Sequence, residues 1–320
     1  MTEFIGHDAA WRQFASALDS GKLHHGWILV GPRGLGKAGF ARRAAAALVD
    51  PQGQYASMIE RGSHPDILTI KRMPKEPAKD GEESDPSAEL KRSISIDQIR
   101  RLQAALTTRP GLSNKRAIII DAADDLERSG ANALLKSLEE PPVGTYFLLV
   151  SHASDRLLPT IRSRCQMLRF EPLDHHDMAT ALRQAAPEMD GAEMDTYIRI
   201  GKGAPGQAID FMGLDLGKLE DAMTSILQTG DRSNQIRSAL AEQLSLKASQ
   251  PRYEAFLRLV PAFIANCARE LNVNDIVHAT EVWTSANALA NRAITLSLDK
   301  QSVVFQMGSL LASLQPNKAT

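Results

Sequence analysis

The stretch Gly31-Pro32-Arg33-Gly34-Leu35-Gly36-Lys37-Ala38 decides the fold of this 320-residue chain. It follows the apolar run Trp27-Ile28-Leu29-Val30, which predicts a buried strand. It precedes a segment in which the apolar residues between Phe40 and Leu48 recur with the spacing of one helix face. A strand, a glycine-rich turn and a helix in this order are typical of a phosphate-binding P-loop. We therefore expect the rest of the chain to be arranged around this loop.

The residues of the loop suit a nucleotide phosphate. Gly31, Gly34 and Gly36 let backbone N–H groups converge on a phosphate. Lys37 adds a cation at the positive end of the following helix. A later apolar run, 116–121, ends in Asp121, a carboxylate that can hold Mg²⁺ beside the phosphates. The loop and the strand-end carboxylate together predict an ATP site, against the alternative of a glycine-rich turn and an unrelated aspartate.

Two alanines argue against hydrolysis at this site. Ala38 stands where a P-loop places the Ser or Thr that ligates Mg²⁺, and it has no oxygen to offer. Ala122 follows Asp121 where an ATPase of this architecture would place a Glu that orients the attacking water. Asp124 and Asp125 lie too far along to replace that Glu. We therefore expect no ATPase activity from the chain itself, and whether the pocket binds ATP stays open because its lysine and glycines remain.

The composition is that of an ordinary soluble globular protein, with 43% hydrophobic and 23% charged residues. The net charge of −1 gives no global basic field, so any contact with DNA must come from a local patch. The two cysteines, Cys165 and Cys267, match no disulfide or zinc framework. No signal peptide opens the chain and no apolar run is long enough to span a membrane. We therefore expect a cytoplasmic protein.

Alternating strands and helices occupy the first half of the chain. The predicted strands are 27–30, 67–70, 116–121, 146–151 and 167–170. Such alternation predicts an α/β fold with a parallel sheet. The charged segment 71–92 is almost free of apolar residues, which predicts a mobile loop. After Pro172 the strand patterns stop and only helices follow, the clearest being 253–271 and 280–298.

Two motifs identify a family. They are the run Asn132-Ala133-Leu134-Leu135-Lys136-Ser137-Leu138-Glu139-Glu140-Pro141-Pro142 and the run Leu157-Leu158-Pro159-Thr160-Ile161-Arg162-Ser163-Arg164-Cys165. With the P-loop and the strand ending in Asp121, they make residues 1–212 resemble the clamp-loader branch of the AAA+ proteins. The resemblance implies a RecA-like AAA+ P-loop domain with a parallel sheet over 1–170, a small helical lid over 171–212 and an all-α collar over 213–320.

The same resemblance assigns a role to Ser163-Arg164-Cys165. In the family the arginine of this Ser-Arg-Cys motif reaches the ATP bound to a neighbouring subunit, as an arginine finger in trans. Arginine suits that role because it is always charged and its planar fork matches phosphate oxygens. The alternative for Arg164 is an ordinary surface salt bridge. For Cys165 we expect a small packing residue rather than a nucleophile, because no histidine partner is recognisable.

Two further positions depart from the family pattern. Gly206 lies in the turn where an active subunit would carry a nucleotide-sensing arginine, so a third catalytic part is missing. Many relatives also carry a four-cysteine zinc module after the first helix, whereas residues 50–64 contain no cysteine. His64 alone cannot hold a metal. We expect no zinc and no required cofactor.

The resemblance also implies partners. They are ATPase subunits of the gamma/tau type, the delta subunit, and, through the assembled heteropentamer, the sliding clamp and primed DNA. The chain would then belong to the DNA polymerase III holoenzyme, a nucleotidyltransferase complex. The alternatives are an active clamp-loader ATPase, which needs Ser or Thr at 38 and Glu at 122, a small-molecule P-loop kinase, or a P-loop scaffold that binds DNA outside a ring.

Overall fold

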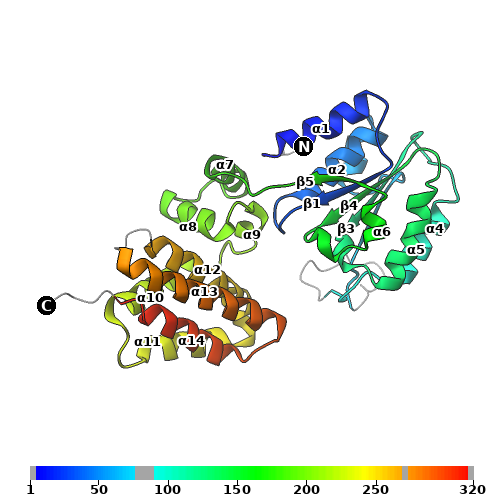
Figure 1. Cartoon of the computed structure of the whole chain (residues 1–320). Coiled ribbons are helices and arrows are strands. Elements are labelled where there is room, and N and C mark those ends of the chain that lie inside the picture. The colour runs from blue at the N-terminus through cyan, green and yellow to red at the C-terminus, as the bar shows by residue number, and fades with distance from the viewer. Residues whose placement is uncertain (1–4, 76–89, 269–272, 316–320) are drawn as a thin grey trace. The chain divides into compact units, whose positions relative to one another are not determined.

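Five parallel strands form the sheet that lies at the centre of the N-terminal part of the chain (Figure 1). Their order across the sheet is β2-β3-β4-β1-β5. The strands are β1 (Gly26–Val30), β2 (Ile67–Lys71), β3 (Arg116–Asp121), β4 (Thr145–Ser151) and β5 (Gln166–Arg169). The predicted α/β fold with a parallel sheet is confirmed, because all four neighbouring pairs of strands run parallel.

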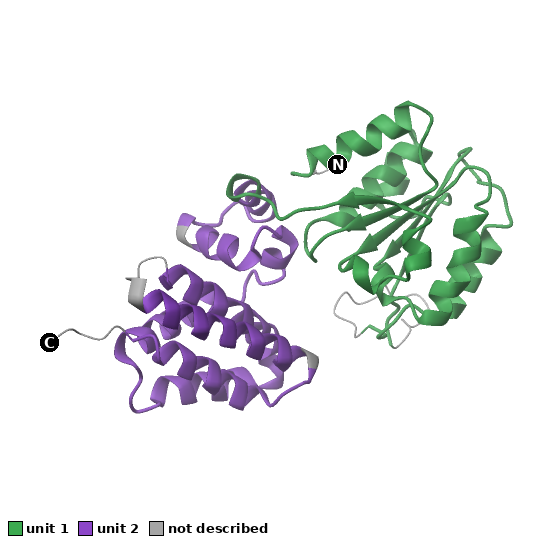
Figure 2. Cartoon of the chain, in the orientation of Figure 1, with its two compact units in different colours: residues 1–177 green, residues 178–320 purple. Residues whose placement is uncertain are grey.

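The structure is a computed structural model that describes residues 5–75, 90–268 and 273–315. The chain divides into two units, residues 1–177 and 178–320 (Figure 2). The finer division into a lid and a collar stays a prediction. Most of the predicted mobile loop 71–92 lies outside the described residues. Its described ends are held, since Lys91 N donates to Met73 O at 2.8 Å.

Helices cover both faces of the sheet in the first unit. They are α1 (Asp8–Asp19), α2 (Lys37–Val49), α3 (Ala56–Glu60), α4 (Ile96–Ala105), α5 (Arg128–Glu139) and α6 (Pro159–Arg162). Helices α1 and α2 lie on one face, and α4 and α5 lie on the other (Figure 1). The short helix α3 was not predicted, because five residues are too few to show a helical period.

The residues of β1 show how alternation builds the two cores. On one face, Trp27 packs edge-to-face against Phe14 of α1, with ring centroids 5.4 Å apart. Phe14 in turn lies 6.1 Å from Phe40 of α2. On the other face, Ile28 joins a buried cluster with Leu134 and Leu138 of α5 and residues of β3 and β4. The first strand and the P-loop that follows it are therefore fixed by apolar packing from both sides.

A capping box begins helix α4. The side chain of Ser95 accepts the backbone N–H of Gln98, and the Gln98 side chain accepts the N–H of Ser95 at 3.2 Å. Each contact satisfies a helix-terminal N–H that has no partner within the helix. Asp174 makes a similar contact at the start of a later helix, since its Oδ1 accepts the N–H of Asp177 at 2.8 Å.

The described part of the second unit contains helices and no strands, as predicted. Helix α7 (His175–Ala185) crosses the boundary between the units. The others are α8 (Gly191–Gly201), α9 (Pro205–Ile209), α10 (Leu216–Thr229), α11 (Gln235–Ser245), α12 (Gln250–Cys267), α13 (Val273–Thr295) and α14 (Lys300–Ala312). The predictions for 253–271 and 280–298 placed α12 and α13 too late. The first residues of α12, Gln250, Pro251 and Arg252, are outside the apolar pattern on which the prediction rested. The first turns of α13 were missed although they contain Val273, Ile276 and Val277.

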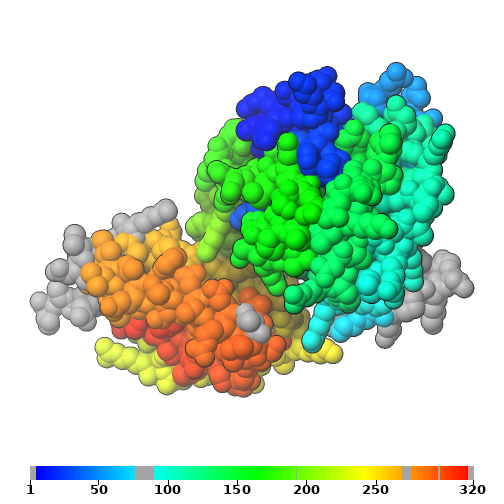
Figure 3. All heavy atoms as spheres, turned by 45° about the vertical axis from the view of Figure 1, so that its right-hand side comes forward, coloured from blue at the N-terminus to red at the C-terminus, as the bar shows by residue number. Residues whose placement is uncertain are grey.

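Helix α13 exposes apolar side chains along its length. It lies at the surface of the helical unit, drawn in orange in Figure 3. The exposed large apolar residues of this helix and the residues just after it are Ile276, Val277, Trp283, Ile294 and Leu296. Contiguous exposed apolar residues are typical of surfaces that pack on other proteins.

Candidate nucleotide and arginine sites

The P-loop connects β1 to α2 at the carboxyl edge of the sheet. Gly34 and Gly36 have φ angles of 85° and 76°, in the left-handed region that favours glycine. A Cβ atom at Gly31 would lie 2.2 Å from the carbonyl oxygen of Phe170, so this position has no room for a side chain. The loop therefore has a backbone conformation and a close packing that need glycine at these three positions.

Lys37 is buried in the loop, with 3% of its surface exposed. Its Nζ donates to the carbonyl oxygens of Gly31 and Pro32, both at 2.5 Å. Burial lowers the pKa of Lys37 to about 8, against the opposing effects of Asp124 and then Asp121. A phosphate would find backbone N–H groups and this cation at the loop. The adjacent Ala38 and Ala122 supply no oxygen for Mg²⁺ or for an attacking water, so the residues fit a phosphate better than they fit a hydrolytic site.

The lowered pKa of Lys37 predicts a pH dependence of stability. Between pH 8 and 10.5 the lysine of the unfolded chain keeps its proton and the folded lysine loses it. The free energy of unfolding should therefore gain from this group as the pH rises through that window. Lys37→Met should remove this increase in stability. The measurement is the free energy of unfolding in urea of the wild type minus that of the variant, which should be larger at pH 10 than at pH 7.5. Equal differences at the two pH values would contradict the burial of a charged lysine.

Asp124 lies at the site although sequence reasoning set it aside. The short 3-10 turn Ala123–Asp125 returns the chain toward the end of β4. There, Asp124 accepts the hydroxyl of Ser151 at 2.8 Å and the backbone N–H of His152 at 2.5 Å. Asp124 also raises the pKa of Lys37 more than Asp121 does. A serine at the end of a buried strand was the signal that could have indicated this contact.

Two histidines lie near Lys37 and were not predicted as site residues. His7 Nε2 donates to the carbonyl oxygen of Leu35 in the loop at 3.1 Å, and its ring lies 4.7 Å from that of Phe170. Burial and the charge of Lys37 lower the pKa of both His7 and His152. The N-terminal segment thus packs against the P-loop, and both imidazoles favour the neutral form.

Arg164 lies in the turn between α6 and β5, at the amino end of β5. Its Nη1 donates to the carbonyl oxygen of Thr160 at 2.9 Å and to Ser163 Oγ at 3.2 Å. Its Nη2 forms an ion pair with Glu139 Oε1 at 2.5 Å. Ser163 Oγ also donates to Thr160 O at 3.1 Å. The two motifs that carry the family resemblance therefore meet in one cluster of polar contacts.

Arg164 and the P-loop lie at opposite edges of the sheet. A Cβ atom at Gly26, the first residue of β1, would lie 3.2 Å from Arg164 O and 2.8 Å from Cys165 Sγ. Gly31 follows the other end of β1, five residues later. At about 3.3 Å per residue the two edges are separated by roughly 16 Å. Arg164 cannot reach a phosphate held by the loop of its own chain.

Cys165 packs under this turn. Burial raises the pKa of its thiol to about 12, so almost none of it is thiolate near neutral pH. A thiol in that state is a poor nucleophile. The geometry agrees with the packing role that the sequence suggested.

A family model described as "DNA polymerase III, delta subunit" matches residues 6–174, more than half of the chain. The match contains the P-loop, Asp121 and Arg164. The chain belongs to this DNA polymerase III delta-subunit family. The resemblance that the motifs indicated is confirmed at this level. Helices α7 to α14 follow the matched residues.

Relatives of this family member include two kinds of DNA polymerase III subunit. The delta′ subunit of Pseudomonas aeruginosa is 29% identical over 206 residues, which cover 61% of this chain and 58% of that protein. The gamma/tau subunit of Mycobacterium tuberculosis is 30% identical over 215 residues, covering 66% of this chain and 36% of that protein. The chain thus matches less than two thirds of the length of either relative. Among solved structures, a gamma-subunit-related protein of Thermotoga maritima is 18% identical with a TM-score of 0.45, covering 94% of this chain and 99% of that one.

Two further predicted positions are His64 in the first unit and Gly206 in the second. His64 is buried, and its Nδ1 accepts the N–H of Asp66 at 3.2 Å. Within the ranges that the structure describes, no group of three or more His, Cys, Asp or Glu side chains is placed to hold a metal ion. The absence of zinc stays a prediction. Gly206 lies in the first turn of α9. None of the described helices combines the length and hydrophobicity that crossing a membrane requires.

Proposed function

We propose that this chain is the non-hydrolysing, delta-prime type of subunit in the clamp loader of DNA polymerase III, acting in DNA replication. Its membership of the delta-subunit family supports the proposal, as do relatives named delta′ in Pseudomonas aeruginosa and Escherichia coli. In this role it supplies Arg164 to ATP bound by a neighbouring subunit and helps to load the sliding clamp onto primed DNA.

The placement of Arg164 carries the proposal. It lies on the sheet edge opposite the P-loop, and its own chain brings no phosphate near it. An arginine so placed serves a nucleotide on a second molecule, as in ring assemblies where subunits join head to tail. Arginine fingers supplied in trans stabilise the charge of the phosphoryl-transfer transition state.

The chemistry of the P-loop supports a non-hydrolysing role. Ala38, Ala122 and Gly206 each replace a side chain that an active subunit uses for Mg²⁺, water or nucleotide sensing. Lys37 and the loop glycines keep the phosphate cradle, so ATP binding without turnover remains compatible with this role. No metal or other cofactor is required of the chain itself.

Residues 213–320, which contain helices α10 to α14, are the expected collar. In the proposed heteropentamer it joins ATPase subunits of the gamma/tau type and the delta subunit. The exposed apolar side chains of α13 supply the kind of surface that such packing buries. The assembly would work in the cytoplasm, and contacts with the clamp and with primed DNA would be made by the complex as a whole.

Omission and add-back test this function. Gamma/tau and delta subunits of the same organism should load the clamp onto primed DNA only after the purified chain is added, measured by clamp retention on DNA circles. The chain alone should hydrolyse no ATP above the background of a Lys37→Ala preparation. Efficient loading without the chain would contradict the proposal. Turnover by the chain alone that Lys37→Ala abolishes would instead support the alternative of an active ATPase.

A further inference from the structure

Glu139 is the carboxylate that meets Arg164. Its Oε1 lies 2.5 Å from Arg164 Nη2, and the other terminal nitrogen, Nη1, donates to Thr160 O and Ser163 Oγ. Both ends of the guanidinium fork are thus held, one by α6 and the turn after it and the other by α5. A guanidinium has five N–H groups, and these contacts use at most three. The arginine keeps donors for a further acceptor while its position is fixed.

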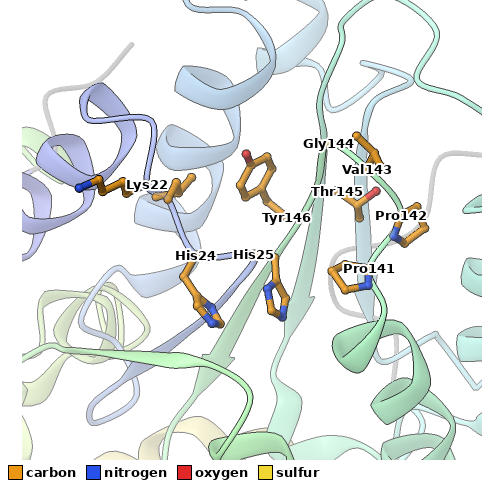
Figure 4. Close-up of a pocket in the computed structure, with 10 residues that line it drawn as sticks. Lys22, His24, His25, Pro141, Pro142, Val143, Gly144, Thr145 and Tyr146 are labelled. Carbon is orange, nitrogen blue, oxygen red and sulfur yellow. The ribbon is translucent and has the colours of Figure 1, made fainter.

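The end of α5 that carries Glu139 is itself fixed. Leu134 and Leu138 are fully buried in the core cluster beneath the helix. His25, just before β1, donates from Nε2 to the carbonyl oxygen of Leu138 at 2.9 Å. Residues 22–25 and 141–146 line a cavity of about 420 Å³ at this amino edge of the sheet, and His25 and Pro141 lie on it (Figure 4). Glu139 therefore projects from a rigid helix end beside an open surface.

We propose that Glu139 is a positioning residue that holds Arg164 ready for the phosphate of a neighbouring subunit. This proposal rests on the proposed function, because Glu139 can position Arg164 for catalysis only if Arg164 acts on the ATP of a neighbouring subunit. Arginine side chains have many rotamers, and an arginine that must first be ordered stabilises a transition state less than one already in place. Glu139 restricts that freedom before the neighbour binds.

An ordinary surface ion pair is the alternative for Glu139 and Arg164. Their side chains are 48% and 33% exposed, and pairs of that exposure contribute little to stability. Loss of the carboxylate should therefore leave the fold intact. That separates the two explanations, because a positioning role predicts lower activity at unchanged stability.

The test uses the clamp loader assembled with the full chain and measures ATPase activity with clamp and primed DNA. Glu139→Gln keeps the shape of the side chain and removes its charge, and we expect kcat at the site that Arg164 serves to fall about tenfold, with a smaller change in the KM for ATP. Glu139→Asp keeps the charge at a shorter reach and should recover part of the rate. Glu140→Gln is the matched control, since it changes the same charge one residue along, at an exposed helix end.

A double-mutant cycle with Arg164→Ala distinguishes the possible failures. If Glu139 acts through Arg164, adding Glu139→Gln to Arg164→Ala should cause no further loss. If the loader with Arg164→Ala hydrolyses ATP slowly but the rate with Glu139→Gln equals that with Glu140→Gln, the positioning role of Glu139 is wrong and the role of Arg164 is supported. If the loader with Arg164→Ala keeps the wild-type ATPase rate, the roles of both Glu139 and Arg164 are wrong. A Glu139→Gln chain that no longer joins the complex in gel filtration would also overturn the inference, because the carboxylate would then serve assembly.

Discussion

Replacing Arg164 by alanine should slow ATP hydrolysis at the neighbouring site by about 10³-fold or more, the scale of a lost arginine finger. The guanidinium is the only part of the Ser-Arg-Cys turn whose charge can offset charge on a transferring phosphoryl group. The steady-state ATPase rate of the reconstituted loader is measured with clamp and primed DNA. It should fall by at least the part of the total rate that comes from the site that Arg164 serves. The KM for ATP should change less than kcat, because the contact is made mainly in the transition state.

Two variants control the Arg164 measurement. Arg164→Lys keeps the positive charge but not the planar fork, and it should recover only a small part of the rate. Arg100→Ala removes an exposed arginine of α4 that pairs with Asp97, and it should leave the rate unchanged. Normal assembly with a wild-type rate for Arg164→Ala would show that the arginine has no role at the neighbour's nucleotide.

The parts of the fold that short patterns encode were predictable. The P-loop between β1 and α2 and the capping box of Ser95 and Gln98 each depend on residues within a few positions of one another. Strand β3 and its terminal Asp121 followed from an unbroken apolar run. Such local patterns also predicted a parallel sheet, because strands that alternate with helices along the chain usually pair in parallel.

Contacts between distant segments could not be read from those patterns. Asp124 meets Ser151 across 27 residues, and Glu139 meets Arg164 across 25. Nothing in the sequence near Asp124 marks it as folding back toward the end of β4. The two family motifs were recognised separately, and only the sheet brings the end of α5 to the turn before β5. Pairings of this kind need the tertiary fold.

Asp66 is another residue that its local sequence did not single out, and its replacement by alanine should destabilise the first unit by about 4 kcal/mol. Its carboxylate is fully buried. It accepts the backbone N–H groups of Gly111 at 2.6 Å, Leu112 at 2.8 Å and Ser113 at 2.9 Å. Asp66→Ala would leave these three donors without an acceptor just before β3, where the loop 111–113 leads into the sheet.

Tryptophan fluorescence can follow this loss in the first unit alone. Trp11 and Trp27 lie in that unit and Trp283 in the other, so urea unfolding in a Trp283→Phe background reports on the first. Asp66→Asn should lose only part of the same stability, because its amide oxygen can still accept the N–H groups of Leu112 and Ser113 while its amide nitrogen cannot accept that of Gly111. Asp19→Ala, at an exposed helix end, should change little. An Asp66→Ala chain within about 0.5 kcal/mol of wild type would show that water or a rearranged loop satisfies the three N–H groups without the carboxylate.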